Sequence, residues 1–269
     1  MMSKMIKDLQ TILNQTKILV SEAKEYILQE VGNVNRSEIE EKELNSLVSY
    51  VDKNTEKLLV KGLLDILPQS GLITEEDTVD DRDKDWIWII DPLDGTTNFL
   101  HQIPYFAISV ALMHKDEIVL GIVHEVTRDE QFFAIKNGGA FLNDRKISVT
   151  ELPSTKDILV ATGFPYNNSY PVEKHFASLK QFLLNTRGMR RLGSAATDLC
   201  YVAAGRLGGY YETSLNAWDV AAGAIIVREA GGKVSDFEGG EDWLFGDSIM
   251  ATAPQFYQDF LHCLEPMRT

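Results

Sequence analysis

Two aspartates follow a block of apolar residues in the segment WIWIIDPLDGTTNF, which runs from Trp86 to Phe99. Pro92 cannot extend the hydrogen-bond ladder of a central strand, so we expect this strand to end at Asp91. Asp94 followed by Gly95 is typical of a turn. One interpretation is structural, a strand that ends in a turn before a capped helix. The other is chemical, a cation site built from two carboxylates that leave the strand together.

Other acidic residues follow or open apolar elements elsewhere in the chain. Glu75 lies in LITEEDT, Asp219 in AWDVAAG and Asp52 in SYVDKNTEK. Carboxylates that converge at one place repel each other and resist burial unless cations lie between them. Magnesium takes oxygen ligands and keeps some of its waters for exchange with substrate. The combination therefore favours a magnesium site over the purely structural interpretation.

The residues after the turn add a possible anion site. A helix that begins at Thr96 would present free N–H groups, and Gly95 would allow the backbone to approach a phosphate closely. Enzymes accelerate phosphate monoester hydrolysis by up to ~10²¹, which is roughly 29 kcal/mol of barrier. One positioned acid or base contributes only ~10²–10⁴. Two metal ions that clamp the attacking and leaving oxygens can supply much of the remainder.

Composition restricts the class of protein. The 269 residues are 44% hydrophobic and 25% charged, which is typical of a globular chain of one large α/β domain or two lobes that share a cleft. The net charge of −14 argues against nucleic acid as the main partner and against an anionic membrane surface. Two cysteines, Cys200 and Cys263, form no disulfide framework, and no apolar run approaches the ~20 residues of a membrane span, so we expect a cytoplasmic protein.

Hydrophobic periodicity predicts the elements that must position these residues. Apolar residues recur at helical spacing from Met5 to Ile27 and again from Ser49 to Leu67, where Pro68 ends the second helix. Strands are expected at 72–74, 86–90, 106–115, 117–126, 130–141, 157–164, 208–212 and 248–252, and further helices at 172–184, 194–205, 217–232 and 254–264. The charged run Glu38–Glu43 is expected to be a solvated loop. This order predicts a layered α/β fold whose first half holds a largely antiparallel sheet.

The motif DPLDGTTNF, with TEEDT upstream and WDVAAG downstream, resembles the inositol monophosphatase family, within the lithium-sensitive, magnesium-dependent sugar phosphatase superfamily. The resemblance covers about Ile6 to Leu264. It implies an αβαβα sandwich of the fructose-bisphosphatase and inositol-monophosphatase type. It also implies a single domain over 1–269, with a lobe at 1–150 that holds most metal ligands and a lobe at 151–269 that holds the substrate pocket and the last ligand. Such proteins are usually homodimers.

The resemblance also implies a role for individual residues, with two to three Mg²⁺ ions per active site. The metal ligands would be Glu75, Asp91, the backbone carbonyl of Leu93, Asp94 and Asp219. The catalytic group would comprise Thr96, which orients the attacking water and pairs with Asp52, together with Glu75. The phosphate would meet the amides of Gly95 and Thr96, and the polyol hydroxyls would meet Asp94, Ser194, Ala195, Glu212 and Asp219.

One loop departs from the pattern of the family. Ser46 stands where an aspartate is usual, and Lys42 falls near a basic position of that loop. The metal ligands are unaffected, so the departure bears only on the mobile catalytic loop and on the third magnesium. The sequence GTTNF, rather than GTKEF, favours the inositol phosphatase branch over the nucleotide 3′-phosphatase branch.

The implied reaction is lithium-sensitive hydrolysis of inositol 1-phosphate to myo-inositol and phosphate by a metal-activated water. Hydrolysis of fructose 1,6-bisphosphate or of the 2′-phosphate of NADP at the same site is the alternative within the enzyme class. A regulatory or binding protein that retains the fold is the alternative of another class. Arg190 and Arg191 could steer an anionic substrate, contact a partner subunit or simply be solvated, and His124 is expected to be a packed histidine.

Overall fold

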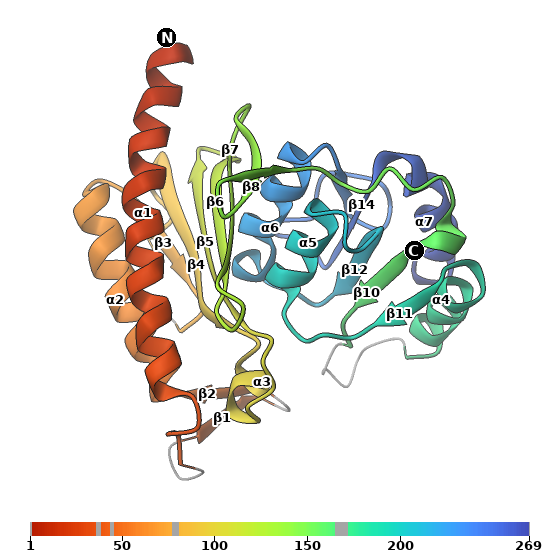
Figure 1. Ribbon diagram of the computed structural model, residues 1–269, viewed down its shortest axis with the longest axis horizontal. Coiled ribbons are helices and arrows are strands. Elements are labelled where there is room, and N and C mark those ends of the chain that lie inside the picture. The colour runs from red at the N-terminus through yellow and green to blue at the C-terminus, as the bar shows by residue number, and fades with distance from the viewer. Residues whose placement is uncertain (1, 36–38, 44–45, 77–80, 165–171, 269) are drawn as a thin grey trace.

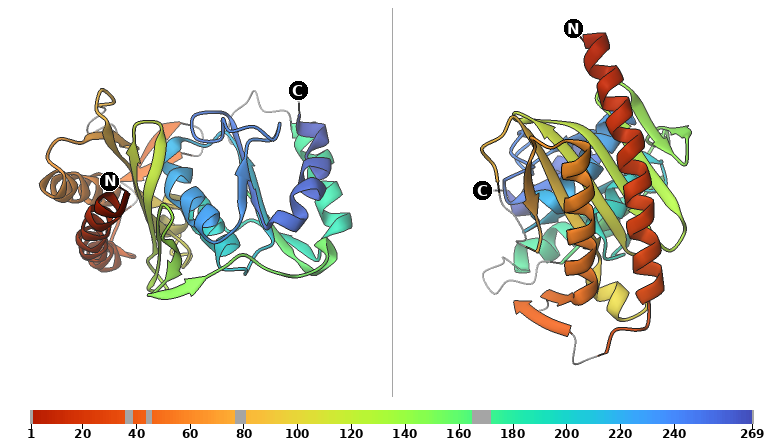
Figure 2. Two further views of the ribbon diagram at one scale, coloured as in Figure 1. Left: turned by 90° about the horizontal axis from the view of Figure 1, so that it is seen from above. Right: turned by 90° about the vertical axis from the view of Figure 1, so that its left-hand side faces the viewer.

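The computed structural model describes residues 2–35, 39–43, 46–76, 81–164 and 172–268, and these form five layers (Figures 1 and 2). A pair of helices, a seven-stranded sheet, a second pair, a five-stranded sheet and a third pair follow one another. The three pairs are α1 (Met2–Glu30) with α2 (Tyr50–Ile66), α5 (Ala195–Ala203) with α6 (Ala217–Glu229), and α4 (Val172–Asn185) with α7 (Tyr257–Cys263). The expected αβαβα sandwich is confirmed.

The larger sheet has the strand order β3-β4-β5-β6-β7-β8-β9, and every neighbouring pair is antiparallel except β3 and β4. Its strands are β3 (Gly71–Thr74), β4 (Trp86–Asp94), β5 (Ala107–His114), β6 (Glu117–Glu125), β7 (Glu130–Ile135), β8 (Gly139–Leu142) and β9 (Arg145–Ile147). The prediction of a largely antiparallel sheet in the first half is therefore confirmed.

The smaller sheet has the order β11-β10-β12-β14-β13 and mixes parallel and antiparallel pairs. Its strands are β10 (Leu159–Thr162), β11 (Gly188–Arg190), β12 (Gly209–Thr213), β13 (Lys233–Ser235) and β14 (Ser248–Thr252). The short elements are the helix α3 (Thr96–Leu100) and the 3₁₀ turns Thr155–Asp157, Pro254–Phe256 and Glu265–Met267.

The prediction of a solvated loop at Glu38–Glu43 is wrong for residues 39–43, and Glu38 lies outside the described residues. Residues 39–43 form β1 (Ile39–Glu43), which pairs antiparallel with β2 (Ser46–Ser49). Backbone pairing with a neighbouring strand overrides the low strand propensity of the charged residues. The side chains of Lys42 and Ser46 lie outside the described residues, so the family departure at this loop stays untested.

Three apolar cores lie between the layers, and the middle one surrounds α5 and α6 and reaches both sheets. The predicted first helix is confirmed, and it buries Leu9, Leu13, Val20, Ala23 and Ile27 against the larger sheet. The larger sheet is buried on both faces, and its strands therefore read as near-continuous apolar runs instead of alternating with polar residues.

Strand β4 sends alternate side chains to the two faces of the sheet. Trp88 and Ile90 pack toward α1 and α2, whereas Ile87 and Ile89 pack toward the middle helices. The expected end of this strand at Asp91 is wrong, because pairing with β5 continues to Asp94 across an irregularity of register between the two aspartates. Pro92 lies within that irregularity, where a bulge tolerates a residue without an N–H.

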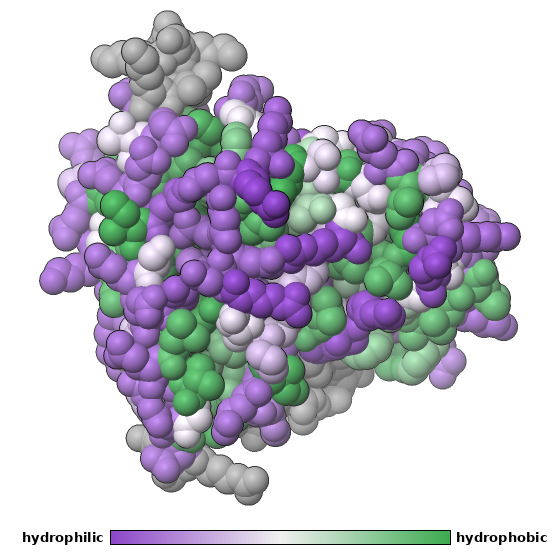
Figure 3. Space-filling view, viewed as in Figure 1, coloured by the Kyte–Doolittle hydropathy of each residue, from purple (hydrophilic) through white to green (hydrophobic). Residues whose placement is uncertain are grey.

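The face in Figure 3 is mixed, with apolar side chains at several places among hydrophilic ones. On α4 four large apolar side chains are exposed, namely Val172, Phe176, Leu183 and Leu184. Exposed apolar groups that gather in this way often mark contact surfaces. The expected homodimer remains a prediction. No described helix is long and apolar enough to cross a membrane.

The close approach of α6 to the larger sheet depends on Gly121 in β6. A Cβ atom there would lie 2.7 Å from the backbone oxygen of Ala222 and 2.5 Å from a methyl carbon of Ile225. We expect Gly121→Ala to lower the free energy of unfolding by about 1–3 kcal/mol, because backbone of α6 must move. Urea titration followed by circular dichroism measures this.

Gly62→Ala in α2 provides the control for that substitution. Its Cβ would meet only side-chain atoms of Leu19, which can move, and alanine favours a helix by about 1 kcal/mol over glycine. Equal destabilisation by the two substitutions would contradict the close-approach argument.

Candidate active site

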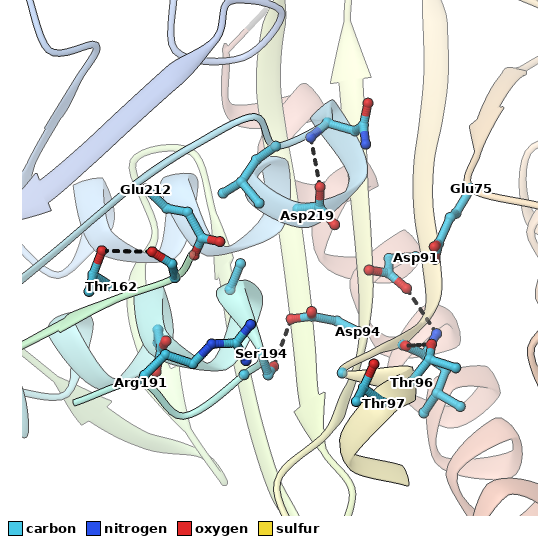
Figure 4. A pocket seen from close by; sticks show the side chains of 18 residues that line it. Glu75, Asp91, Asp94, Thr96, Thr97, Thr162, Arg191, Ser194, Glu212 and Asp219 are labelled. Carbon is cyan, nitrogen blue, oxygen red and sulfur yellow. Dashed lines mark hydrogen bonds between the residues drawn. The ribbon is translucent and has the colours of Figure 1, made fainter. Parts of the chain in front are cut away.

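A cavity of about 250 Å³ opens where the end of β4 meets the first turns of α5 and α6 (Figure 4). Acidic residues dominate its lining, with threonines, glycines and one arginine. The lining residues include Glu75, Asp91, Leu93, Asp94, Gly95, Thr96, Thr97, Thr162, Gly163, Arg191, Gly193, Ser194, Ala195, Asp198, Glu212, Leu215, Asn216 and Asp219. All the site residues singled out in the sequence line this cavity except Asp52, which lies directly behind it.

Three aspartates form the centre of the site. Asp91, Asp94 and Asp219 each offer a carboxylate oxygen, and these oxygens lie within 4.8 Å of one another. Asp91 is 1% exposed and Asp94 is 9% exposed. Figure 4 shows that Glu75 points at Asp91 from the other side. Four carboxylates from three distant parts of the chain therefore converge.

The contact between β5 and α6 explains why Asp219 reaches Asp91. Asp91 pairs across the sheet with Ser109, and the Ser109 hydroxyl donates to the backbone oxygen of Trp218 at 3.0 Å. Asp219 is the next residue, in the first turn of α6, where its Oδ2 accepts from the N–H of Asn216 at 2.7 Å. The same carboxylate thus caps the helix and faces the cavity.

Each of the three aspartates has one oxygen held by the protein. Asp91 Oδ1 accepts from the N–H of Leu93 at 2.9 Å. Asp94 Oδ2 accepts from the Ser194 hydroxyl at 2.6 Å and from the N–H of Ala196 at 2.7 Å. These bonds fix the orientation of the three carboxylates.

Burial and mutual repulsion raise the pKa values of these carboxyl groups. Burial is the main cause for Asp91, and the charges of Glu75, Asp94 and Asp219 raise its pKa further. Burial also raises the pKa of Asp94 to about 6, although the bonds from Ser194 and Ala196 oppose the shift. The pKa of Asp219 is raised by burial and by Asp94 and Glu75. Protons and cations therefore compete for the same oxygens.

Two buried residues of α2 support the acidic cluster from behind. Glu56 accepts the N–H of Glu76 at 2.8 Å through its Oε2 and so holds the segment that carries Glu75. The sequence analysis missed Glu56, because an acidic residue in a helix gives no local signal of full burial. Asp52 is also fully buried.

Asp52 connects the start of α2 to Thr96. Its Oδ2 accepts from the N–H and the hydroxyl of Ser49, at 2.9 and 2.7 Å. The Thr96 hydroxyl oxygen lies 2.8 Å from Asp52 Oδ1 and 2.9 Å from the carbonyl oxygen of Leu93. The expected pairing of Thr96 with Asp52 is thus present in the geometry.

The opposite wall of the cavity comes from the second half of the chain. Ser194 caps α5, and Glu212 in β12 accepts the Tyr210 hydroxyl at 2.6 Å. Burial raises the pKa of Glu212 to about 7. A Cβ atom on Gly163 would lie 1.8 Å from Glu212 Oε1, so only glycine leaves room for this carboxylate.

Two more polar residues lie at this wall. Asp198, which the sequence analysis missed, lies one helical turn after Ser194 and accepts the Tyr105 hydroxyl at 2.8 Å. Arg191 is the one basic residue of the cavity lining among the described residues and is also exposed, so steering of an anionic substrate and a solvated position both stay open for it. His124 is buried as expected, and its Nε2 lies 3.1 Å from an oxygen of Asp129.

The donor set fits hard divalent cations. It consists of carboxylate oxygens and a backbone carbonyl, without sulfur or imidazole among the described lining residues. Buried carboxylates with raised pKa values are stabilised when a cation replaces the protons. Glu75, Asp91, Asp94, Asp219 and the Leu93 carbonyl are the groups that could hold such ions.

Comparisons with known proteins agree with this geometry. A sequence profile of the inositol monophosphatase family matches residues 8–265. Inositol-1-monophosphatase of Mesorhizobium japonicum is 41% identical over 224 residues, which cover 83% of this chain and 84% of that protein. Nus factor SuhB of Pasteurella multocida is 39% identical over 226 residues, which cover 84% and 85% of the two chains.

Solved structures of inositol monophosphatases and SuhB proteins resemble the fold of this chain. The extragenic suppressor protein SuhB of Bartonella henselae superposes with a TM-score of 0.91 at 36% identity, over 95% of this chain and 98% of that one. Inositol monophosphatase from Anabaena superposes with a TM-score of 0.86 at 31% identity, over 96% of both chains. This chain belongs to the inositol monophosphatase family.

Proposed function

We propose that the protein is a magnesium-dependent phosphomonoesterase that hydrolyses the monophosphate of a small polyol, with inositol 1-phosphate as the first candidate. The observation that carries the proposal is the convergence of Glu75, Asp91, Asp94 and Asp219 beside Gly95 and Thr96 in one cavity. A protein that only binds partners has no need of four converging carboxylates that repel each other.

The acidic residues would hold two to three Mg²⁺ ions, with the Leu93 carbonyl as a further ligand. Bound magnesium supplies Lewis-acid stabilisation of the phosphoryl oxygens and lowers the pKa of water. The third ion would depend on Glu75 and on the loop of Lys42 and Ser46. The amides of Gly95 and Thr96 would receive the phosphate, since Gly95 adopts a φ of 94° that places backbone at the cavity wall.

Thr96 and Asp52 would orient the attacking water. The single proton of the Thr96 hydroxyl can serve either Asp52 or the Leu93 carbonyl. If the carbonyl faces a cation, the proton belongs to Asp52, and a lone pair of Thr96 Oγ1 is left to accept a hydrogen bond from water. Glu75 at the edge of the cluster would accept the proton that this water loses.

The opposite wall would bind the alcohol part of the substrate. Ser194, Ala195 and Glu212, together with Asp94 and Asp219, would meet hydroxyl groups, and hydroxyl recognition by buried polar groups is strongly selective. Inositol 1-phosphate leads because several relatives are named inositol-1-monophosphatase. Fructose 1,6-bisphosphate and NADP remain the alternatives within the class.

A role in protein contacts is the second candidate function. It is favoured by the names of other relatives, which are called Nus factor SuhB. Such a role does not require the carboxylate cluster, and it can coexist with catalysis. The expected homodimer and the cytoplasmic location also stand as proposals.

A panel of four phosphate esters tests the proposal directly: inositol 1-phosphate, fructose 1,6-bisphosphate, NADP and adenosine 3′,5′-bisphosphate. We expect phosphate release to require Mg²⁺, to fall with Li⁺ and to be fastest for inositol 1-phosphate. Phosphate is measured colorimetrically with Mg²⁺, with EDTA and with Mg²⁺ plus Li⁺. A different leading substrate would change the substrate but keep the class, whereas no release from any compound would leave the binding role.

Asp91→Asn tests the central carboxylate. It keeps the size of the side chain but removes the charge, so we expect kcat/KM to fall on the order of 10³-fold, beyond the ~10–100-fold typical of residues outside the metal ligands. In EDTA the variant should melt no lower than the wild type, because a repulsive buried charge has gone. Asp116→Asn on an exposed turn is the matched control. Activity within tenfold of wild type would refute the assignment.

Magnesium should stabilise the protein more at pH 8 than at pH 6. Among the proposed ligands, Asp94 has a pKa raised to about 6, and the pKa values of Asp91 and Asp219 are raised well above their ordinary range. The metal-free native state therefore binds more protons than the unfolded chain from about pH 4 to above pH 6. Its stability therefore falls as pH rises through that window, and cations replace the lost protons.

If the metal-free native state holds about one proton more than the unfolded chain, its free energy of unfolding falls by about 1.4 kcal/mol per pH unit. That change corresponds to ~2–4 °C in Tm for a chain of this size. Thermal melts with and without 5–10 mM Mg²⁺, roughly the excess needed for saturation, measure the difference. An equal shift of Tm at both pH values would contradict the competition between protons and cations.

A further inference from the structure

The two walls of the cavity are joined at Asn98, a buried residue of α3 that belongs to neither the acidic cluster nor the cavity lining. Its side-chain nitrogen donates to the backbone oxygens of Tyr105 and Leu192, each at 2.8 Å. Leu192 opens the segment that carries Ser194, 94 positions further along the chain. One amide group therefore satisfies two carbonyls, one 7 and the other 94 positions further along the chain.

The backbone around this contact is packed too closely for side chains. Gly193 has a φ of 96°, and a Cβ atom on it would lie 2.8 Å from the Asn98 nitrogen. A Cβ atom on Gly95 would lie 3.0 Å from the oxygen of Gly193 and 3.1 Å from the oxygen of Tyr105. The segments 95–98, 105–106 and 192–194 thus form one tight junction.

Asp94 strengthens the same junction from the cavity side. Its Oδ2 receives the Ser194 hydroxyl and the Ala196 N–H, as Figure 4 shows for Ser194. The segment 192–196 is therefore tied to the segment 94–98 by three hydrogen bonds, two at Asp94 and one at Asn98. Only the bond at Asn98 is independent of the acidic cluster.

We propose that Asn98 is a positioning residue that sets the alcohol-binding wall of the cavity at a fixed distance from the phosphate-binding wall. This inference rests on the proposed function. A phosphate monoester must reach both walls at once, so its binding depends on their separation. Inorganic phosphate needs only the wall formed by Gly95 and Thr96, so its binding does not depend on the separation of the two walls.

The two ligands together separate a positioning role from general damage. We expect Asn98→Ala, in the full-length protein with Mg²⁺, to raise KM for inositol 1-phosphate about tenfold and to change kcat less than threefold. This split is expected when an interaction is equally strong in the ground and transition states. The inhibition constant of inorganic phosphate should stay within twofold of the wild-type value. If inositol 1-phosphate is not the leading substrate of the panel, the leading polyol phosphate takes its place.

Two further variants serve as a replacement and as a control in this experiment. Asn98→Ser keeps one donor and should give an intermediate KM, and it replaces Asn98→Ala if that variant fails to fold. Asn185→Ala removes an amide that donates to the backbone oxygen of Gln181 on exposed α4, and it should leave both constants unchanged.

The outcomes distinguish the two proposals. Wild-type turnover with an unchanged KM in the Asn98 variants would overturn the positioning role alone. A parallel rise in KM and in the inhibition constant of phosphate would also overturn it, because the whole site would then have been disturbed. Absence of any magnesium-dependent turnover in the wild type would overturn the proposed function and the positioning role together.

Discussion

The structure is organised around the repulsion among carboxylates that are buried together. Asp91, Asp94 and Asp219 bring oxygens within 4.8 Å of one another, and Glu75 points at the same centre. Such an arrangement raises the pKa values of Asp91, Asp94 and Asp219 and costs stability in the absence of protons or cations. The fold must therefore hold the carboxylates against their own repulsion, and the five layers with their three apolar cores provide that support.

The support is local as well as global. One oxygen of each aspartate accepts a hydrogen bond from an N–H or a hydroxyl of the protein, which fixes the orientation of the carboxylate. Behind the cluster, Glu56 and Asp52 of α2 hold the segment of Glu75 and the hydroxyl of Thr96. Residues behind the cavity thus determine the geometry of those that line it, an arrangement that is common at metal sites.

Asp94 links the two halves of the chain. It belongs to the acidic cluster, yet its Oδ2 also anchors Ser194 and Ala196 of the opposite wall. The acidic cluster and the position of the wall that carries Ser194 are therefore connected through one side chain. The cavity is narrow enough, at about 250 Å³, that small displacements of either wall change its shape.

The sequence by itself was sufficient for the layered α/β class, the antiparallel first half, the first two helices and the residues that converge, because periodicity and motif spacing are local properties. It was wrong on the end of β4 and on the run at 39–43, where pairing with a neighbouring strand overrides local preference. The sequence could not predict the contacts of Glu56, of Asp198 and of Asn98 with Leu192, because these partners lie 20 to 94 positions away. Only the tertiary structure decides such contacts, because burial and hydrogen-bond partners depend on which distant segments the layers bring together.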